Sequence, residues 1–198
     1  ISVIVIWAMG INYKDISDTE LYYMLKGSKM ESKKAFDELY RRYSTNIYTY
    51  CRKVLNNDPM AEDIFQETFT RFYESASRER EMTNVSGYLL KIARNLCLNE
   101  KSKKYQESVS IDDLQLPHYD VSYGNKQLNE LLQTALDAIP KKYREVIVLR
   151  EFLDMSYKEI AEALDTTMPI VRIRIYRAKS KIRELLAPYV EEMKDYNR

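Results

Sequence analysis

The sequence predicts an all-α protein made of two small helical domains joined by a flexible acidic linker. Gly and Pro are scarce, with 4 and 5 among 198 residues, and apolar residues recur at helical spacing almost throughout. A convincing alternating strand pattern is absent outside residues 1–7. Residues 105–125 lack clear periodicity and contain no Lys or Arg. A segment of this length is long for a loop within a compact domain. We therefore interpret residues 106–126 as the linker.

The first domain, residues 18–105, is expected to contain four helices. A short helix covers about 18–26, with Ser17 or Asp18 as its cap. A longer one covers about 32–55 and ends at the Asn-Asn-Asp-Pro sequence of residues 56–59. Two more cover about 59–76 and 85–104. The expected buried residues of the second helix are Phe36, Leu39, Tyr40, Tyr43, Ile47, Tyr50, Cys51 and Val54.

The second domain, residues 127–198, is expected to place two helices, 128–138 and 140–152, before a helix-turn-helix. Ser156 and Glu159 have the spacing of a capping box, so a helix should begin there. Asp165 follows where the chain must turn, and Asp tolerates a left-handed backbone better than most residues. Pro169 suits the first turn of the next helix. This arrangement is typical of proteins that read the major groove of DNA.

The second helix of this motif combines a buried stripe with a cationic outer face. Its apolar residues recur at steps of four and three at Val171, Ile175, Ala178, Ile182 and Leu185. The run 169–183 also contains Arg172, Arg174, Arg177, Lys179, Lys181 and Arg183, without an acidic residue. On the outer face, Ile173 is either an ordinary exposed apolar side chain or a contact for a thymine methyl group. We interpret this face as a DNA-binding surface.

The N-terminal half contains an acidic helix with its own pattern. Asp63, Gln66 and Glu67 lie on a strip beside the apolar face of the helix that starts near Pro59. A favourable interaction with the helix dipole explains the acidic residues Asp58 and Glu62 near the start of the helix. The same interaction explains Gln66 and Glu67 poorly. We assign the aromatic residues farther along this helix, Phe69 and Phe72, to the core.

The next helix exposes cations beside a polar loop. Lys91, Arg94 and Lys101 lie on its outer side, and the polar loop of residues 80–86 precedes it. Aromatic residues, including Tyr88, are close in sequence. Cations can bind phosphates, aromatic rings can stack on bases, and polar groups can contact base edges. The combination indicates a site for single-stranded DNA.

Five segments together resemble a bacterial extracytoplasmic-function (ECF) sigma factor of the sigma-70 family. They are AFDELYRRYSTNIYTYCRKVL, DPMAEDIFQETFTRFYES, NVSGYLLKIARNLCLNEKSKK, IPKKYREVIVLREFLDMSYKEIAEAL and VRIRIYRAKSKIRELL. They cover about residues 18–105 and 127–190, in the order and spacing of the family. The resemblance implies a region 2 domain at 18–105, and a winged-helix-like region 4 domain with the helix-turn-helix at 127–198.

The resemblance also implies a role for individual residues. Asp63, Gln66 and Glu67 match the motif that docks on the clamp helices of the largest polymerase subunit. Asn84, Ser86 and Tyr88 match the loop that captures a flipped base of the minus-ten element, with Lys91, Arg94 and Lys101 flanking that strand. Arg172, Ile173, Arg174, Tyr176 and Arg177 match the helix that reads the minus-thirty-five element.

Three departures from the family pattern leave the promoter sequence open. The family commonly has Gly-Thr where this chain has Pro169-Ile170, Ser where it has Ile173, and Trp where it has Tyr88. The implied partners are core RNA polymerase, promoter DNA as duplex and as melted strand, and an anti-sigma protein. The implied activity needs neither catalysis by this chain nor a cofactor, and no membrane insertion is expected.

Composition is consistent with this interpretation. The net charge of +1 indicates no partner by itself, but basic residues cluster at 91–104 and 169–183 and acidic ones at 58–81. Two cysteines, Cys51 and Cys97, favour a reduced, cytoplasmic compartment over a disulfide framework. A single histidine, His118, makes a zinc site or a Cys–His nucleophile implausible. We expect Met9 to be the start and residues 1–8 to be an upstream extension.

Three alternatives have different consequences. A free-standing helix-turn-helix regulator would bind duplex DNA without polymerase and would leave Asp63, Gln66 and Glu67 without a role. A helical nuclease would need a metal cluster, a phosphate-binding loop or a His-based dyad, and the sequence offers none. A helical adaptor that binds only proteins predicts that neutralising Arg172 or Arg177 changes nothing.

Overall fold

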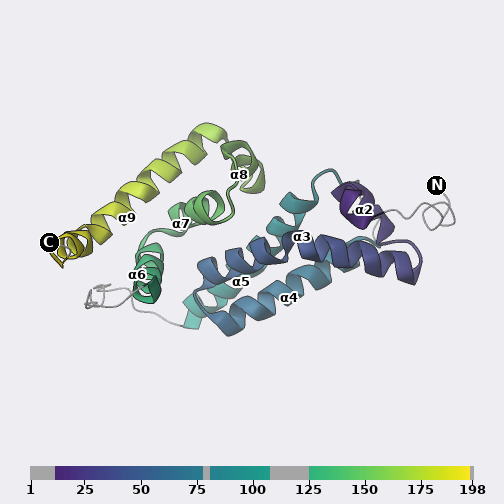
Figure 1. Cartoon of the computed structure of the whole chain (residues 1–198), viewed down its shortest axis with the longest axis horizontal. Helices are drawn as coiled ribbons and strands as arrows, with labels where there is room; N and C mark the ends of the chain where they lie inside the picture. The colour runs from purple at the N-terminus through teal and green to yellow at the C-terminus, as the bar shows by residue number, and fades with distance from the viewer. Residues whose placement is uncertain (1–11, 78–80, 108–124, 197–198) are drawn as a thin grey trace.

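A computed structural model describes residues 12–77, 81–107 and 125–196 (Figure 1). The regular elements in these ranges are all helical: η1 (Tyr13–Asp15), α2 (Asp18–Met24), α3 (Lys29–Leu55), α4 (Asp58–Ser75), α5 (Val85–Glu107), α6 (Asn125–Ala138), α7 (Lys141–Ile147), the π-helical turn η2 (Val148–Phe152), α8 (Tyr157–Ala163) and α9 (Met168–Tyr196). The predicted all-α class is confirmed. Because these ranges contain no strand, they contain no β-hairpin that could form the wing of a winged helix. The expected extension at residues 1–8 and most of the expected linker lie outside them.

Local capping signals fix where several helices begin and end. Ser17 with Glu20 and Ser156 with Glu159 form the capping boxes of α2 and α8. Helix α3 begins three residues earlier than expected, because Ser28 caps it together with Glu31. It ends at Asn56, which has a left-handed backbone with φ 50° and whose N–H donates to the carbonyl of Arg52 at 2.9 Å.

Helices α2 to α5, with η1, form an N-terminal unit around an aromatic core. Tyr22, Leu39, Tyr50 and Phe72 are almost completely buried in it, and the assignment of Phe69 and Phe72 to the core is confirmed. The prediction that Tyr40 is buried is wrong, since its side chain is 40% exposed. Its ring instead lies over the edge of the core with its centroid 4.8 Å from that of Phe69, because α3 turns this position toward solvent beside α4.

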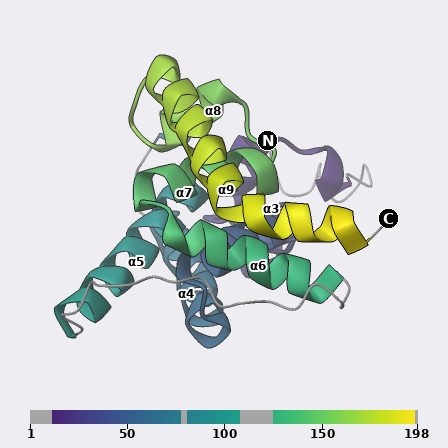
Figure 2. The same ribbon diagram turned by 90° about the vertical axis from the view of Figure 1, so that its left-hand side faces the viewer.

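Helices α6 to α9 form a C-terminal unit in which α9 lies beside α6, α7 and α8 (Figure 2). The helix expected at 140–152 is α7 followed by the π-helical turn η2. The expected turn at Asp165 is confirmed, with φ 52°, and Thr166 N–H closes it by donating to the carbonyl of Ala161 at 2.9 Å. Val171, Ile175 and Ala178 are buried as expected.

The two units pack directly on each other. Helix α3 contacts η2, helix α5 contacts α8, and the buried apolar residues of both units form one continuous cluster. Burial of apolar side chains is the main favourable contribution to such packing. Cys51 and Cys97 are buried and unbridged within it. In the ranges that the structure describes, none of the helices has the length and apolar character needed to cross a membrane.

The pairing of Glu38 in α3 predicts a pH dependence of stability. Arg41 and Arg42 both donate to the Glu38 carboxylate at 2.8 Å, and Arg42 also donates to the Lys14 carbonyl at 2.9 Å, which ties η1 to α3. The hydrogen bond from Arg41, and next that from Arg42, lowers the pKa of Glu38 from 4.5 to about 2.

We expect Glu38→Gln to lower the free energy of unfolding more near neutral pH than in acid. A carboxyl group whose pKa is lower in the folded chain stabilises it fully above the unfolded pKa of 4.5, and this contribution is lost as the pH falls toward about 2. Urea unfolding of the unmodified chain and of the Glu38→Gln variant at several pH values measures the difference in their free energies of unfolding. A difference that stays constant across this range would contradict the expectation.

Candidate nucleic-acid interface

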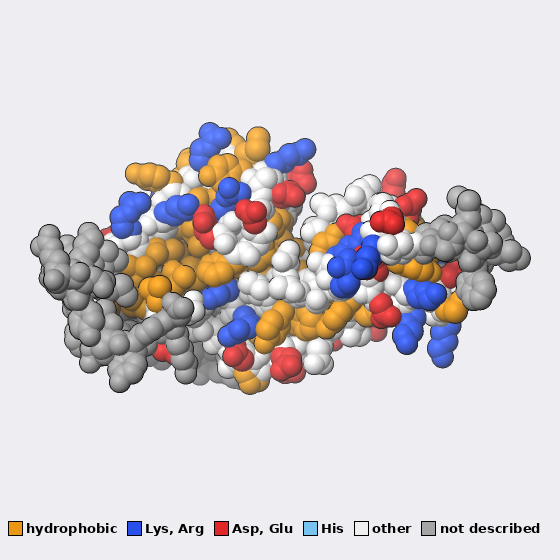
Figure 3. All heavy atoms as spheres, viewed as in Figure 1, with side chains coloured by type: hydrophobic (Ala, Val, Ile, Leu, Met, Phe, Trp, Pro, Cys, Tyr) orange, Lys and Arg blue, Asp and Glu red, His pale blue; other side chains and the backbone are white. Residues whose placement is uncertain are grey.

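The outer face of α9 presents cations and apolar side chains together. Ile173 is 51% and Tyr176 is 75% exposed, and Arg172 and Arg177 are exposed beside them. Figure 3 shows Lys and Arg side chains along this helix mixed with hydrophobic ones. Burial of the opposite stripe against the rest of the unit holds the helix in this orientation. A helix that is anchored on one side and cationic on the other can enter a major groove.

Arg172 is held by an aromatic stack that the sequence analysis missed. Its guanidinium carbon lies 6.0 Å from the ring centroid of Tyr157, and that of Arg150 lies 5.4 Å from the same centroid. Arg150 also donates to the carbonyl of Met155 at 2.8 Å, which ties η2 to the segment before α8. Cation–π contacts of this kind restrict an arginine without neutralising it, which leaves its charge available to DNA.

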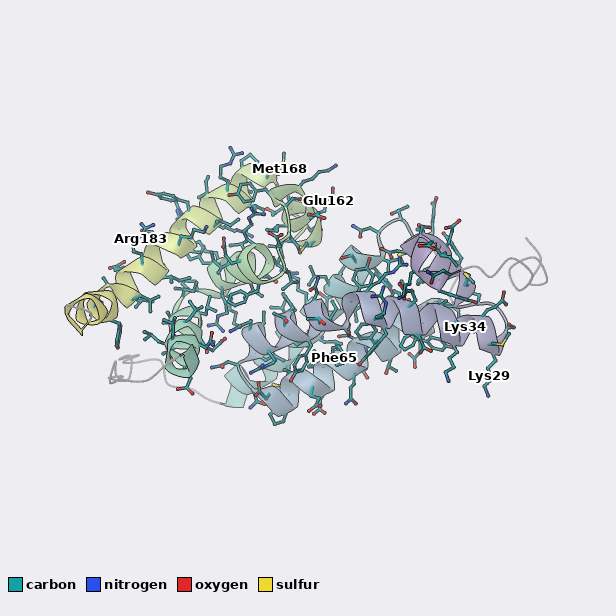
Figure 4. The ribbon with its side chains drawn as sticks, in the orientation of Figure 1. Lys29, Lys34, Phe65, Glu162, Met168 and Arg183 are labelled. Carbon is teal, nitrogen blue, oxygen red and sulfur yellow. The ribbon has the colours of Figure 1, made fainter. Side chains whose placement is uncertain are left out.

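The acidic strip on α4 is accessible. Asp63 and Gln66 are exposed, whereas Glu67 is half-buried and accepts a hydrogen bond from Arg71 at 2.7 Å. Phe65, labelled in Figure 4, lies beside this strip and stacks edge-on with Phe69 and Tyr48. The strip is therefore supported by a layer of aromatic rings, and Asp63 and Gln66 are exposed for contact with a partner surface.

The loop before α5 has Asn84 in a capping role. The Asn84 side-chain oxygen accepts from the Gly87 N–H at 2.8 Å, and its carbonyl accepts from the Tyr88 N–H at 3.1 Å. A Cβ at Gly87 would lie 2.8 Å from the Asn84 amide nitrogen, so glycine permits this close approach. The oxygen of Asn84 is occupied, and its amide N–H groups are the part suited to a base acceptor. Ser86 is exposed. Tyr88 is half-buried, and its ring centroid lies 6.2 Å from that of Phe72.

The cations predicted to flank the strand differ in their surroundings. Lys91 is exposed on α5, but Arg94 is engaged by the C-terminal unit, with its Nε 2.6 Å from Oε1 of Glu145 in α7. Tyr50 donates to the same oxygen at 3.1 Å. The side chain of Lys101 lies outside the described residues. Glu145 is not among the residues predicted from the sequence, because a carboxylate in a cationic segment carries no signal of a partner 51 residues away.

The electrostatics of this cluster follow from its burial. Burial, followed by the charge of Glu145, raises the pKa of the Tyr50 hydroxyl well above its ordinary value. Burial lowers the pKa of Arg94 while the Glu145 hydrogen bond raises it, and the net shift is upward. Both groups therefore keep their protons, and both donate to Glu145.

A cleft of about 350 Å³ lies next to this cluster, between the start of α5 and α8. Its lining includes Asn84, Ser86, Tyr88, Lys91 and Arg94, so the structure brings together the residues predicted to hold a melted strand other than Lys101. The opposite wall comes from α8 and the turn after it. The α9 face and the α4 strip lie on other elements, so the predicted site residues form three separate surfaces.

Family models match both units. The sigma-70 region 2 model matches residues 39–106, and the sigma-70 region 4 model matches residues 129–182. The ECF RNA polymerase sigma factor SigE of Mycolicibacterium smegmatis is 31% identical over 165 residues, which cover 80% of this chain and 64% of SigE. The ECF RNA polymerase sigma factor SigW of Bacillus subtilis is 30% identical over 176 residues, which cover 82% of this chain and 94% of SigW.

Solved structures agree on the fold. CnrH, determined in complex with the cytosolic domain of CnrY, superposes with a TM-score of 0.65 at 20% identity, covering 87% of this chain and 99% of CnrH. The sigma factor RpoE from Bartonella quintana, crystallised with the anti-sigma factor NepR, superposes with a TM-score of 0.62 at 20% identity, covering 78% of this chain and 98% of RpoE. The family matches in both units, together with the helix-turn-helix geometry, lead to one conclusion: the chain belongs to the ECF sigma factors of the sigma-70 family, which direct RNA polymerase to promoters.

Proposed function

We propose that the three surfaces divide the work of a sigma factor among themselves. The α4 strip of Asp63, Gln66 and Glu67 docks on core RNA polymerase, the cleft at the start of α5 holds the melted minus-ten strand, and the outer face of α9 reads the minus-thirty-five duplex. Residues 18–105 and 127–198 act as the two domains, with 106–126 as their linker. The observation that carries this proposal is that one chain presents all three surfaces on separate elements.

The chemistry of each surface suits its partner. Exposed carboxylate and amide groups on α4 can pair with a cationic protein surface without disturbing the core beneath them. The amide of Asn84, the ring of Tyr88 and the charge of Lys91 supply base-edge contact, stacking and phosphate binding. Arginines on α9 can contact phosphates or guanine edges, and Ile173 can contact a thymine methyl group.

Two further parts of the proposal concern regulation and location. We expect the chain to act in the cytoplasm, where its partners are and where Cys51 and Cys97 stay reduced. We expect an anti-sigma protein to control it, as the crystal structure of the similarly folded RpoE with the anti-sigma factor NepR suggests.

The first test is binding to core RNA polymerase. We expect the double variant Gln66→Ala/Glu67→Lys to weaken binding about 30-fold or more, the loss expected for a hot spot of about 2 kcal/mol. The Glu67–Arg71 pair that it removes is exposed and contributes little to folding. Fluorescence titration of the labelled chain with purified core polymerase measures the change.

Glu74→Lys is the matched control, because it reverses an exposed charge on the same helix outside the strip. It should bind like the unmodified chain. Equal binding by the double variant and the control would overturn the assignment of the α4 strip. Tight duplex binding by the chain without polymerase, unaffected by either variant, would favour a free-standing regulator.

A further inference from the structure

Two arginines lie on opposite flanks of the α9 outer face. Positions 172 and 177 are about 140° apart around the helix, because successive residues turn by about 100°. Ile173 and Tyr176 lie between them on the same face, and both are exposed. Arg172 and Arg177 are exposed as well. Long, exposed side chains of this kind are free to adopt many rotamers unless a neighbour holds them.

Tyr157 of α8 holds the arginine on the first flank. The guanidinium carbon of Arg172 lies 6.0 Å from the centroid of the Tyr157 ring, and the ring is half-buried. Arg150 helps to place this ring, because its guanidinium carbon lies 5.4 Å from the same centroid and its Nη1 donates to the carbonyl of Met155. A ring over the face of a guanidinium leaves the N–H donors at its edge available. Arg172 can therefore be held and still bind a phosphate or a guanine.

Tyr143 of α7 holds the arginine on the second flank. Tyr143 is only 7% exposed, because α9 packs on α7, and its hydroxyl accepts a hydrogen bond from Arg177. This hydrogen bond is the main cause that lowers the pKa of the hydroxyl below 10.0, against the opposing effect of burial. A buried side chain that is fixed in α7 therefore restricts the guanidinium of Arg177.

The two contacts reduce the side-chain entropy that is lost when DNA binds. Ordering one flexible side chain at an interface costs a free energy equivalent to about two- to tenfold in affinity. An arginine that is already restricted avoids part of this cost, provided that the restricted position is the one that meets the DNA. Non-specific binding depends instead on the number of phosphates that cations neutralise, and an uncharged tyrosine does not change that number.

We propose that Tyr157 and Tyr143 are positioning residues for promoter recognition, which hold the arginines of the two flanks in place before DNA binds. The inference rests on the role proposed above for the outer face of α9 in reading the minus-thirty-five duplex. Neither tyrosine has to touch DNA in order to contribute. The two residues increase specificity for one sequence, whereas the arginines also supply attraction to any duplex.

NMR of the nitrogen-15-labelled full chain without DNA measures the two contacts directly. The Nε–Hε signal of Arg172, identified by its absence in Arg172→Ala, should shift in Tyr157→Leu because the ring current is removed. It should stay in place in Tyr157→Phe, which keeps the ring. The signal of Arg177, identified in the same way, should shift in Tyr143→Phe, which removes only the hydroxyl. Signals that stay in place in Tyr157→Leu and Tyr143→Phe would overturn the proposal.

Duplex binding is measured by fluorescence anisotropy of holoenzyme at constant salt. One probe is a duplex that the unmodified holoenzyme enriches from a random-sequence library, and the other is the unselected duplex pool. Tyr157→Leu and Tyr143→Phe should each weaken binding to the enriched duplex about two- to tenfold and leave binding to the pool unchanged. Tyr157→Phe should bind both probes like the unmodified chain. Tyr13→Leu is the matched control, because it removes a ring whose centroid lies 5.7 Å from the Lys34 ammonium, away from α9.

A double-mutant cycle distinguishes positioning from a general effect on the fold. In an Arg172→Ala chain, Tyr157→Leu should cause no further loss, whereas Tyr143→Phe should cause its full loss. Losses that add fully for Arg172 and Tyr157 would overturn positioning. Circular dichroism melting of each variant checks that it is folded.

The arginine variants separate this inference from the proposed function. If Arg172→Ala and Arg177→Ala both bind the enriched duplex like the unmodified chain, the role of the α9 face is overturned, and this inference with it. If the arginine variants lose binding while Tyr157→Leu and Tyr143→Phe retain it, the role of the face stands and only the positioning role is overturned.

Discussion

Replacing Arg172 and Arg177 by alanine should abolish most recognition of the minus-thirty-five element while leaving polymerase binding intact. Each arginine can contact a phosphate or a base edge, and one such contact to a base contributes about 1–3 kcal/mol. Losing two should weaken holoenzyme binding to its duplex by about 1,000-fold, if each contact contributes near the middle of that range. Both residues are exposed on α9, and circular dichroism melting of the variant checks the effect of losing the Arg177–Tyr143 hydrogen bond.

The measurement uses duplex fragments that the unmodified holoenzyme enriches from a random-sequence library, because the chain departs from the family pattern at Pro169, Ile170 and Ile173 and its promoter sequence is open. Lys179→Ala is the matched control. It removes a cation from the same helix, but Lys179 is paired with Glu151 at 2.9 Å. The control should lose little affinity. Unchanged binding by the double variant would support an adaptor that contacts only proteins.

Replacing Arg144 by leucine should lower the free energy of unfolding by about 3–5 kcal/mol, the cost of breaking a buried pair by removing one partner. Arg144 donates to the carbonyls of Leu136 and Asp137 at 2.7 and 2.5 Å, and it pairs with the Asp137 carboxylate at 2.7 Å. These carbonyls belong to the last turn of α6, which has no intrahelical donors for them. Arg144 is therefore the C-terminal cap of α6.

Urea unfolding of the full chain measures this effect. Arg144→Lys keeps the charge but lacks the planar guanidinium that reaches both carbonyls. Its stability should therefore fall between that of the unmodified chain and that of the leucine variant. Burial lowers the pKa of Arg144, and Asp137 opposes that shift. A loss below about 1 kcal/mol in the leucine variant would show that solvent replaces these contacts.

Much of the fold could be predicted because its signals are local. The capping box at Ser156 and Glu159, the left-handed turn at Asp165 and the buried stripe of α9 all depend on residues within a few positions of one another. The same holds for the end of α3 at Asn56. Such signals set the order and approximate bounds of the helices, and with them the helix-turn-helix.

The site was predicted unevenly for the same reason. Exposure of Ile173 followed from helical periodicity on a single element. The exposure of Tyr40 could not be predicted from periodicity. Two neighbouring turns of α3 both carry apolar side chains, and the position of α4 decides which of these turns is covered. The stack of Arg150 and Arg172 on Tyr157 joins three elements and has no sequence pattern.

Sequence patterns alone predicted the helices, the capping of α2 and α8, and the family. Only the tertiary structure decided that the two units share one core, and that Glu145 holds Arg94 across them. The difference arises because these interactions act over different separations along the chain. Periodicity and capping act within about one helical turn, whereas an ion pair between residues 51 positions apart exists only when two helices pack at one particular angle and register.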